Sequence, residues 1–316
     1  MKFNLMNRKS EISKNYEGEK AFVLTPQLEL YTAVATAGLS DQFYATADEK
    51  VQRIVKLIGK NDAAFVAKLA IYVREQMHLR SIPILLTVEL AKLHQGDGLI
   101  RKMTERVIQR ADEIMELLAY YSISNQRNDV KQLNKLSKQL QKGLAEAFNK
   151  FDEYQFAKYN RDAKVKLRDA LFLVHPKAKD EVQQNIFDKI AKNELAVPYT
   201  WEVELSVLGQ QKFDSVELKK EAFKSKWEEL IFSNKLGYMA LMRNLRNILE
   251  AEVSNEALNK VCADLSNARA VAKSKQLPFR FLSAYRELKK LNHGRVSKVL
   301  EALEEAVVYS AANIAG

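Results

Sequence analysis

The sequence predicts an all-α protein, and three observations lead to this prediction. The 316 residues include only ten glycines and five prolines, too few for an all-β chain that must turn every ~8–12 residues. Apolar residues recur every three or four positions along most of the chain, which is the spacing of an amphipathic helix. No segment alternates polar and apolar residues in the manner of a strand ladder. Many helices with short links favour an α-solenoid, although no regular sequence repeat is visible and a compact helical bundle stays an alternative.

Helical patterning begins after a polar lead-in. Residues 1–20 have no sustained period and are expected to form an arm, and residues 21–316 are expected to form one helical-repeat domain. The clearest helix is expected at residues 99–121, where six apolar residues share one face: Ile100, Met103, Val107, Ala111, Ile114 and Leu118. The same pattern predicts helices near 49–59, 62–77, 82–94, 130–149, 164–175, 180–192, 215–233, 238–250, 255–272, 279–291 and 295–313.

Glycine and proline mark several of the boundaries. Gly96 and Gly98 interrupt the pattern after one helix, and Pro278 suits the first turn of another. Pro176 disfavours helical geometry at the residue before it. We therefore expect His175 at the C-terminus of a helix.

Positive charge is concentrated in one part of the chain. Fifty Lys and Arg residues against forty Asp and Glu give a net charge of +10, which favours a polyanionic partner such as nucleic acid or an anionic membrane surface. Residues 127–179 contain thirteen basic and six acidic residues, a difference of +7. Such a concentration strengthens binding to nucleic-acid phosphates through counterion release. The alternative is a solvated lysine-rich face, which is common on soluble proteins.

Three basic side chains of this segment are predicted to share one helical stripe. Lys164, Arg168 and His175 are spaced by four and seven residues, which places them on one side of a helix over residues 164–175. His175 has a second interpretation, because a helix C-terminus stabilises an imidazolium without any ligand. Three upstream aromatic residues are candidates for stacking on unpaired bases or, alternatively, for the core: Tyr154, Phe156 and Tyr159.

Arginines form a second candidate group. In residues 238–248 the apolar side chains predict a buried stripe that leaves Arg243 and Arg246 on the opposite side. An arginine ladder of this kind suits phosphates. The alternative is a structural role, with the guanidinium groups paired to carboxylates or carbonyls of the next repeat. Arg280 and Arg286 invite the same two interpretations.

Catalytic and metal-binding motifs are not visible. The sequence has no glycine-rich phosphate loop, no His-Glu-x-x-His and no Gly-x-Ser-x-Gly. The four histidines lack metal-ligand spacing, and Cys262 alone allows neither a disulfide framework nor a cysteine-rich zinc site. No apolar run has the length of a signal-peptide core or a membrane span. We therefore expect a soluble, cytoplasmic protein without cofactor, metal or membrane partner.

Three segments resemble the Ro autoantigen family, whose RNA-binding module is the TROVE domain. The first is residues 158–159 (KY) followed by 167–177 (LRDALFLVHPK). The second is residues 239–245 (MALMRNL), and the third is residues 277–282 (LPFRFL) followed by 284–285 (AY). The order and spacing of the segments also match, and the likeness extends from about residue 20 to the C-terminus.

The resemblance implies a toroid of HEAT-like helical repeats, closed or nearly closed into a ring. Family members bind small noncoding Y RNAs on a basic outer surface and receive single-stranded 3′ ends of misfolded RNAs in the central hole. Lys158 and His175 match positions implicated in holding Y RNA, and Arg161 lies where the family also places positive charge. Together with the charge pattern, the expected outer RNA-binding residues are Lys158, Arg161, Lys164, Arg168, His175 and Lys177.

The resemblance also indicates residues for the central hole. Lys138 and Lys142 fall on the helix that faces the hole in the family, where Gln141 replaces an arginine. The expected hole residues, including those from the arginine pattern, are Lys138, Lys142, Arg243, Arg246 and Arg280. Family members usually continue into a von Willebrand factor A domain with a divalent-metal site of the Asp-x-Ser-x-Ser type. That motif is missing from this sequence, so no metal site is expected.

The expected function is non-enzymatic RNA binding in RNA quality control. The expected partners are small structured noncoding RNA, single-stranded RNA ends and a ribonuclease, and the protein is expected to be a monomer. Two alternatives stay open. An α-solenoid scaffold would bind proteins on its concave surface, and a helical enzyme would use dispersed carboxylates, for which no paired arrangement is visible.

Overall fold

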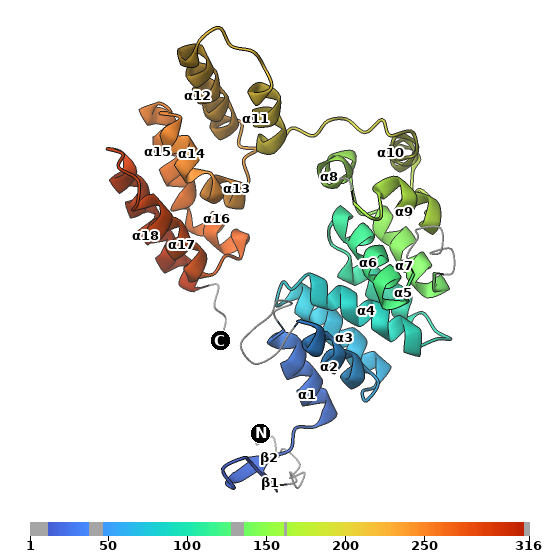
Figure 1. Cartoon of the computed structure of the whole chain (residues 1–316). Helices are drawn as coiled ribbons and strands as arrows, with labels where there is room; N and C mark the ends of the chain where they lie inside the picture. Colours follow the sequence, from blue (N-terminus) through green and yellow to red (C-terminus); the bar gives the residue numbers. More distant parts are fainter. Residues whose placement is uncertain (1–11, 38–46, 128–135, 161–162, 313–316) are drawn as a thin grey trace. The chain divides into compact units, whose positions relative to one another are not determined.

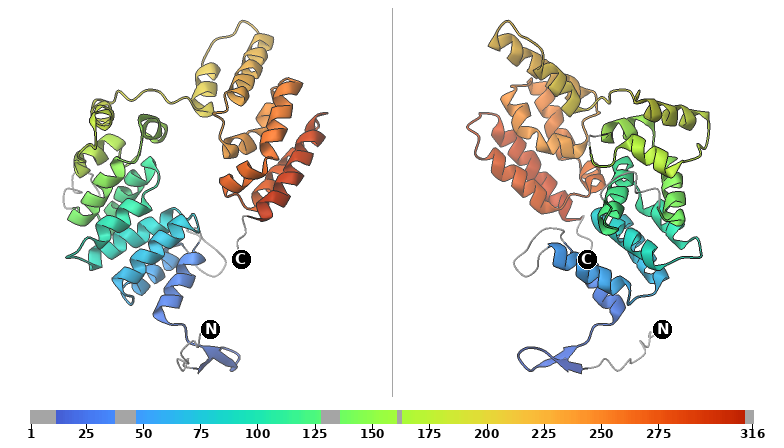
Figure 2. Two further views of the ribbon diagram at one scale, coloured as in Figure 1. Left: turned by 180° about the vertical axis from the view of Figure 1, so that it is seen from behind. Right: turned by 45° about the vertical axis from the view of Figure 1, so that its right-hand side comes forward.

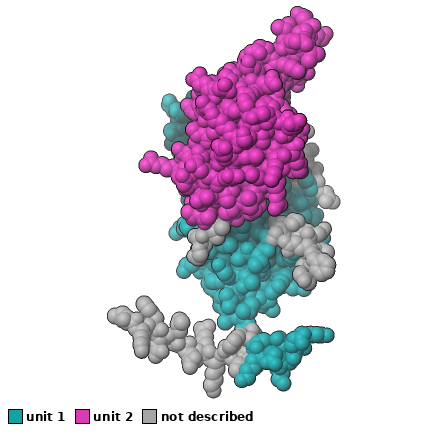
Figure 3. All heavy atoms as spheres, turned by 90° about the vertical axis from the view of Figure 1, so that its left-hand side faces the viewer, with its two compact units in different colours: residues 1–197 teal, residues 198–316 magenta. Residues whose placement is uncertain are grey.

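The computed structural model describes residues 12–37, 47–127, 136–160 and 163–312. Within these residues the chain forms eighteen α-helices and one hairpin of two three-residue strands, which confirms the all-α prediction. The residues divide into two compact units, 1–197 and 198–316, coloured separately in Figure 3. Each unit has its own apolar core and is described by itself.

Unit 1 is a stack of paired helices (Figure 1). Its elements are β1 Ile12–Lys14, β2 Lys20–Phe22, α1 Pro26–Ala35, α2 Ala47–Ile58, α3 Ala63–Glu75, α4 Ser81–Leu93, α5 Leu99–Val107, α6 Ala111–Ser124, α7 Lys138–Phe148, α8 Glu153–Tyr159, α9 Leu167–Val174 and α10 Glu181–Lys192. The odd-numbered helices α1 to α9 pack successively on one another, and so do the even-numbered helices α2 to α8. This two-row arrangement, seen from two further sides in Figure 2, is that of an α-solenoid.

Unit 2 consists of helices alone in its described part, residues 198–312. They are α11 Trp201–Gly209, α12 Val216–Phe232, α13 Tyr238–Arg243, α14 Leu245–Glu250, α15 Asn255–Leu265, α16 Ala268–Ser274, α17 Pro278–Leu288 and α18 Val296–Ala311. Pro278 is the first residue of α17, as predicted. The one-domain organisation over residues 21–316 and the closure of the repeats into a ring stay predictions.

The N-terminal lead-in contains more order than the sequence pattern indicates. Strands β1 and β2 pair antiparallel within the segment that was expected to be an arm. Three short helices were also missed: α1, α8 and α11. Side chains at their N-caps accept hydrogen bonds from the first turn, such as Thr25 from Leu28 and Asp152 from Gln155. Capping therefore starts helices too short to show a sustained apolar period.

Three predicted helices are broken in the structure. The helix expected at 99–121 divides into α5 and α6, that at 238–250 into α13 and α14, and that at 255–272 into α15 and α16. The predicted apolar face of the first is nevertheless correct, because all six of its residues are at most 1% exposed. The apolar period correctly predicted which side of the helix is buried. It wrongly predicted one continuous helix where the structure has two.

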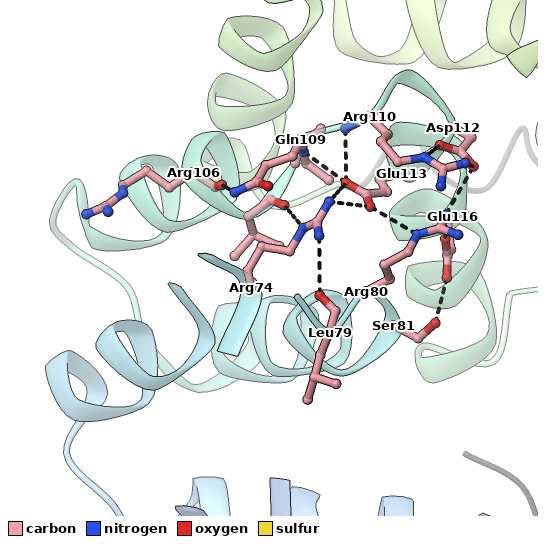
Figure 4. Close-up of polar contacts among 12 residues, drawn as sticks. Arg74, Leu79, Arg80, Ser81, Arg106, Gln109, Arg110, Asp112, Glu113 and Glu116 are labelled. Carbon is pink, nitrogen blue, oxygen red and sulfur yellow. Dashed lines mark hydrogen bonds and ion pairs between the residues drawn. The ribbon is translucent and has the colours of Figure 1, made fainter. Parts of the chain in front are cut away.

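A buried ionic network stabilises the break between α5 and α6 (Figure 4). Glu113, which is fully buried, accepts hydrogen bonds from the backbone N–H groups of Gln109 and Arg110 at 2.9 and 3.1 Å. Arg74 from α3 donates to both oxygens of this carboxylate at 2.7 and 3.0 Å. Its Nε also donates to the carbonyl of Val107 at 3.0 Å, at the end of α5. One ion pair thus satisfies backbone groups on both sides of the break.

In the described part of the chain, no helix combines the length and the apolar character that crossing a membrane requires.

Candidate nucleic-acid interface

Helix α9 carries the centre of the predicted RNA-binding segment. Its buried face is formed by Leu167, Ala170, Leu171 and Val174. His175 follows as the C-cap in the left-handed region, with φ 50°, and its N–H donates to the carbonyl of Leu171 at 2.9 Å. The prediction that His175 lies at a helix C-terminus is therefore confirmed.

The exposed stripe of α9 differs from the predicted one. The helix begins only at Leu167, so Lys164 precedes it and the predicted stripe of Lys164, Arg168 and His175 was wrong in its first member. The stripe instead contains Phe172, four residues after Arg168 and three before His175. The Phe172 ring is 51% exposed, and the Arg168 guanidinium lies over it at 5.6 Å. Phe172 was not among the predicted site residues, although its position opposite the buried apolar positions is visible in the sequence.

Helix α7 lies beside the end of α9 and contributes two lysines. Gln141 donates to the carbonyl of Leu173 at 3.0 Å, and Asn149 donates to that of Lys177 at 2.9 Å. Lys142 lies on α7 between these two residues, both of which hydrogen-bond to residues 173–177. Lys138 lies one turn before Lys142, and both side chains are exposed.

We refer to four cations of this region and one imidazole as the α7–α9 basic surface: Lys138, Lys142, Arg168 and Lys177, together with His175. All five are exposed, and none forms an ion pair with a described residue. Among the described residues, Lys138 makes one hydrogen bond, from its Nζ to Gln141 at 3.2 Å. The uncompensated charge of this surface is therefore available to an anionic partner.

Other cations of the same segment have structural roles. The Nζ of Lys150 donates to the carbonyls of Glu105 and Ile108 at 2.6 and 2.8 Å, at the end of α5. The Nζ of Lys179 donates to the carbonyl of Asn149 at 2.9 Å. The charge of residues 127–179 thus divides into a structural part and an uncompensated part.

The predicted aromatic residues of α8 also divide. Phe156 is fully buried and packs on Phe148 with ring centroids 5.7 Å apart, so it belongs to the core. Tyr154 is 44% exposed. The Nζ of Lys158 lies 5.7 Å from the Tyr154 ring and 5.8 Å from the Tyr159 ring.

Of the remaining outer-surface residues, Lys164 is exposed in the bend before α9, and Arg161 lies outside the described residues. Lys158, on α8, forms no ion pair with any described residue. Of the predicted outer set, Arg168, His175 and Lys177 therefore belong to the α7–α9 basic surface, whereas Lys158 and Lys164 are not members of it.

The arginines of the second group lie together in unit 2. Arg243 ends α13 and Arg246 lies in the first turn of α14. The break between these helices is at Asn244, which is 2% exposed and donates to the carbonyl of Ala240 at 2.8 Å. Asn247 donates to the side-chain oxygen of Asn244 at 2.9 Å. This buried amide fixes the relative direction of the two short helices.

A pocket of about 250 Å³ brings Arg243, Arg246 and Arg280 together, the last from α17. Arg246 pairs with Glu250 at 2.8 Å, and this hydrogen bond raises the pKa of Arg246. Glu287, the acidic residue lining the pocket, pairs with Lys290 at 2.6 Å, which lowers the pKa of Glu287.

Arg243 and Arg280 form no ion pair with any residue described in unit 2. The predicted hole residues thus fall in two groups, the α7 lysines in unit 1 and these arginines in unit 2.

Among the described residues, His, Cys, Asp and Glu side chains form no group of three that suits a metal ion. Cys262, in unit 2, is half-buried, and its burial raises the pKa of the thiol.

Comparison with known proteins identifies relatives of two kinds. Telomerase protein component 1 of Rattus norvegicus is 23% identical over 319 residues, and that of Mus musculus is 23% identical over 320 residues. Each alignment covers 76% of this chain and 12% of the relative, so the chain spans a small part of those proteins.

The crystal structure of the Deinococcus radiodurans Ro (RSR) protein has the same fold, with a TM-score of 0.59 and 18% identity. The match covers 92% of this chain and 65% of that one. The TROVE domain family matches residues 30–226 and 192–310. These two matches together extend over nearly the whole chain, which therefore belongs to the TROVE domain family.

Proposed function

We propose that the protein is a non-enzymatic RNA-binding protein whose α7–α9 basic surface holds a small structured RNA of the Y type by its phosphates. The observation that carries this proposal is that α7 and the end of α9, which are in contact, present His175 and four exposed cations without described ion pairs. Membership of the TROVE domain family supports it. Lys158, Arg161 and Lys164 would extend the contact along the RNA backbone.

Exposed cations suit this partner for a physical reason. Each lysine or arginine that neutralises a phosphate releases a counterion, so the affinity falls as salt rises. Arg168 and His175 flank Phe172, whose exposed ring offers a stacking surface for an unpaired base beside the charges. Such a combination favours a stem with an adjoining loop over a plain duplex.

The same proposal includes single-stranded RNA. Arg243, Arg246 and Arg280, which line one pocket in unit 2, would contact the single-stranded 3′ ends of misfolded RNAs. We further propose a cytoplasmic role in RNA quality control, as a monomer and together with a ribonuclease partner.

Removing three cations of the α7–α9 basic surface tests the proposal. We expect the variant K142Q/R168Q/K177Q to bind a stem-loop RNA with a Kd raised about tenfold or more, because three phosphate contacts are lost. The slope of log Kd against log salt should fall by about 2–3. The measurement is a filter-binding titration at several KCl concentrations.

The matched control is K56Q/K60Q/K68Q, which removes the same charge from exposed lysines on or next to α2 and α3. If both variants lose affinity equally, the effect is one of net charge and the α7–α9 basic surface is not the site. Thermal unfolding should be the same for wild type and both variants, since all six side chains are exposed.

Phe172→Ala tests the stacking contact separately from charge. We expect its Kd for a stem-loop RNA to rise about tenfold, because one base–aromatic stack is lost. Its Kd for a blunt RNA duplex should stay unchanged, because a duplex offers no unpaired base. The salt slope should also stay unchanged. Equal losses for both RNAs would show that Phe172 acts through the fold and not through a base.

A ribonuclease assay on single-stranded RNA tests the non-enzymatic part of the proposal, and cleavage by purified protein would contradict it. The scaffold alternative is tested by capture from a lysate with and without nuclease. Captured proteins that persist after complete RNA digestion would favour the scaffold.

A further inference from the structure

We propose that the pocket between α13, α14 and α17 seats one nucleotide of single-stranded RNA, with the phosphate on Arg243 and Arg280 and the base on the apolar floor. The inference rests on the proposed RNA-binding function. It goes further by assigning a binding site for one nucleotide to unit 2, in which the arginines bind the phosphate and the apolar lining binds the base.

The two free arginines provide the phosphate-binding wall. Three arginines and one glutamate line the pocket, so its charge is positive. Arg246 is engaged by Glu250, and Glu287 is engaged by Lys290. Arg243 and Arg280 keep their guanidinium groups uncompensated by any described residue of unit 2, and a guanidinium matches the geometry of two phosphate oxygens.

Apart from the three arginines, Glu287 and Ser283, the lining of the pocket is apolar, and we call this apolar part the floor. Met242, Leu245 and Leu288 are at most 6% exposed and present the floor of the pocket, together with Met239 and Ala284. Methionine adapts to flat groups and makes favourable contacts with aromatic rings. A nucleobase is such a group, because its faces are apolar and its edge carries the polar atoms.

An exposed aromatic ring lies next to one of the pocket arginines. Phe279 precedes Arg280 and is 54% exposed, and the Arg280 guanidinium lies 5.2 Å from the centre of its ring. A base next to the seated nucleotide would stack on this ring, as bases do on exposed aromatic residues of single-strand binding proteins.

The size of the pocket favours one nucleotide over a duplex or a helix. Its volume of about 250 Å³ lies just below the range of ordinary small-ligand pockets. An acidic peptide would satisfy the arginines equally well, but its short carboxylate side chains would leave the apolar floor without a partner. The combination of the arginines and the apolar floor therefore selects RNA.

The test uses the full chain and hexauridylate carrying a fluorescent label, with binding followed by anisotropy. We expect R243Q/R280Q to raise the Kd for hexauridylate about tenfold or more, because charge-assisted bidentate contacts are lost. A hexamer of the same backbone without bases should bind wild type more weakly than hexauridylate and should lose little further affinity when the floor is altered by Met239→Gln.

The matched control is R269Q/K273Q, which removes two exposed basic side chains of unit 2 that do not line the pocket. Equal affinity of R243Q/R280Q and this control for hexauridylate would overturn the inference. Competition by a hexaglutamate peptide as strong as that by unlabelled hexauridylate would also overturn it, in favour of a protein ligand.

The stem-loop titration separates this inference from the proposed function. If K142Q/R168Q/K177Q loses affinity for the stem-loop RNA and R243Q/R280Q retains wild-type affinity for hexauridylate, the function stands and the pocket does not. If wild type binds neither RNA, the proposed function fails.

Discussion

Replacing Glu113 by alanine is expected to lower the free energy of unfolding of unit 1 by about 3–5 kcal/mol, the usual loss when one partner of a buried ion pair is removed. The carboxylate is fully buried and accepts two backbone N–H groups in addition to the guanidinium of Arg74. Without it, Arg74 stays 94% buried with an uncompensated charge, since its exposed fraction is 6%. The N-terminus of α6 also loses its cap.

Urea denaturation followed by two signals measures this effect. Far-UV circular dichroism reports both units, and tryptophan fluorescence reports unit 2, since the only two tryptophans, Trp201 and Trp227, lie there. We expect the unfolding transition of unit 1, followed by circular dichroism, to move to a lower urea concentration. The transition followed by tryptophan fluorescence should not move. Following both signals also shows whether the transition is two-state, which a chain of two units need not obey.

Glu116→Ala is the matched control on the same helix. Glu116 accepts from Ser81 at 3.0 Å and lies 3.6 Å from Arg80, and its side chain is 38% exposed. An exposed ion pair contributes about 1 kcal/mol or less. If Glu113→Ala costs no more than Glu116→Ala, the network of Figure 4 does not stabilise the break between α5 and α6.

The same network explains how far the sequence predicts the fold. The period of three and four residues identifies the apolar face, because residues at this spacing lie on one side of a helix. It does not reveal where a helix stops when the cause is remote. Arg74 and Glu113 are 39 positions apart. Asn244 donates a hydrogen bond to the carbonyl of Ala240 in the preceding helix, and in sequence it cannot be distinguished from an asparagine on the surface.

The sequence predicts which types of residue belong to the candidate site, but it does not predict which of these residues lie together in space. His175 could be placed at a helix end because Pro176 restricts the residue before it. The position of Lys142 relative to Lys177 depends on the contact between α7 and α9, which includes the hydrogen bond from Gln141 to Leu173. That bond joins residues 32 positions apart, and no local pattern encodes it.

Gly143→Ala is the second substitution with a large expected effect. Helix propensity and packing change the free energy of unfolding in opposite directions for it. Alanine is the better helix former by about 1 kcal/mol. In this structure, however, a Cβ at Gly143 would lie 2.6 Å from the carbonyl oxygen of Arg101 and 2.6 Å from the Cβ of Thr104. Both atoms are backbone or next to backbone on α5, so they cannot swing away, and overpacking of this kind costs about 3 kcal/mol.

The packing effect is therefore expected to dominate, with a net loss of about 2 kcal/mol in the free energy of unfolding of unit 1. Gly59→Ala is the control, because the nearest atom to its added Cβ is the carbonyl oxygen of Lys56 at 3.7 Å, an ordinary contact. It should change stability by about 0.5 kcal/mol or less. A stabilising effect of Gly143→Ala in urea denaturation would mean that α5 and α7 separate without cost.

The same substitution connects packing to function. Gly143 follows Lys142, and the close approach of α7 to α5 at this point sets where the lysine lies relative to residues 173–177. A shift of α7 is expected to weaken stem-loop binding even under conditions where the variant is fully folded. Gly143→Ala should thus lower both stability and affinity, whereas K142Q/R168Q/K177Q lowers affinity alone. This difference separates the role of α7 as a support for the α7–α9 basic surface from the charges that it carries.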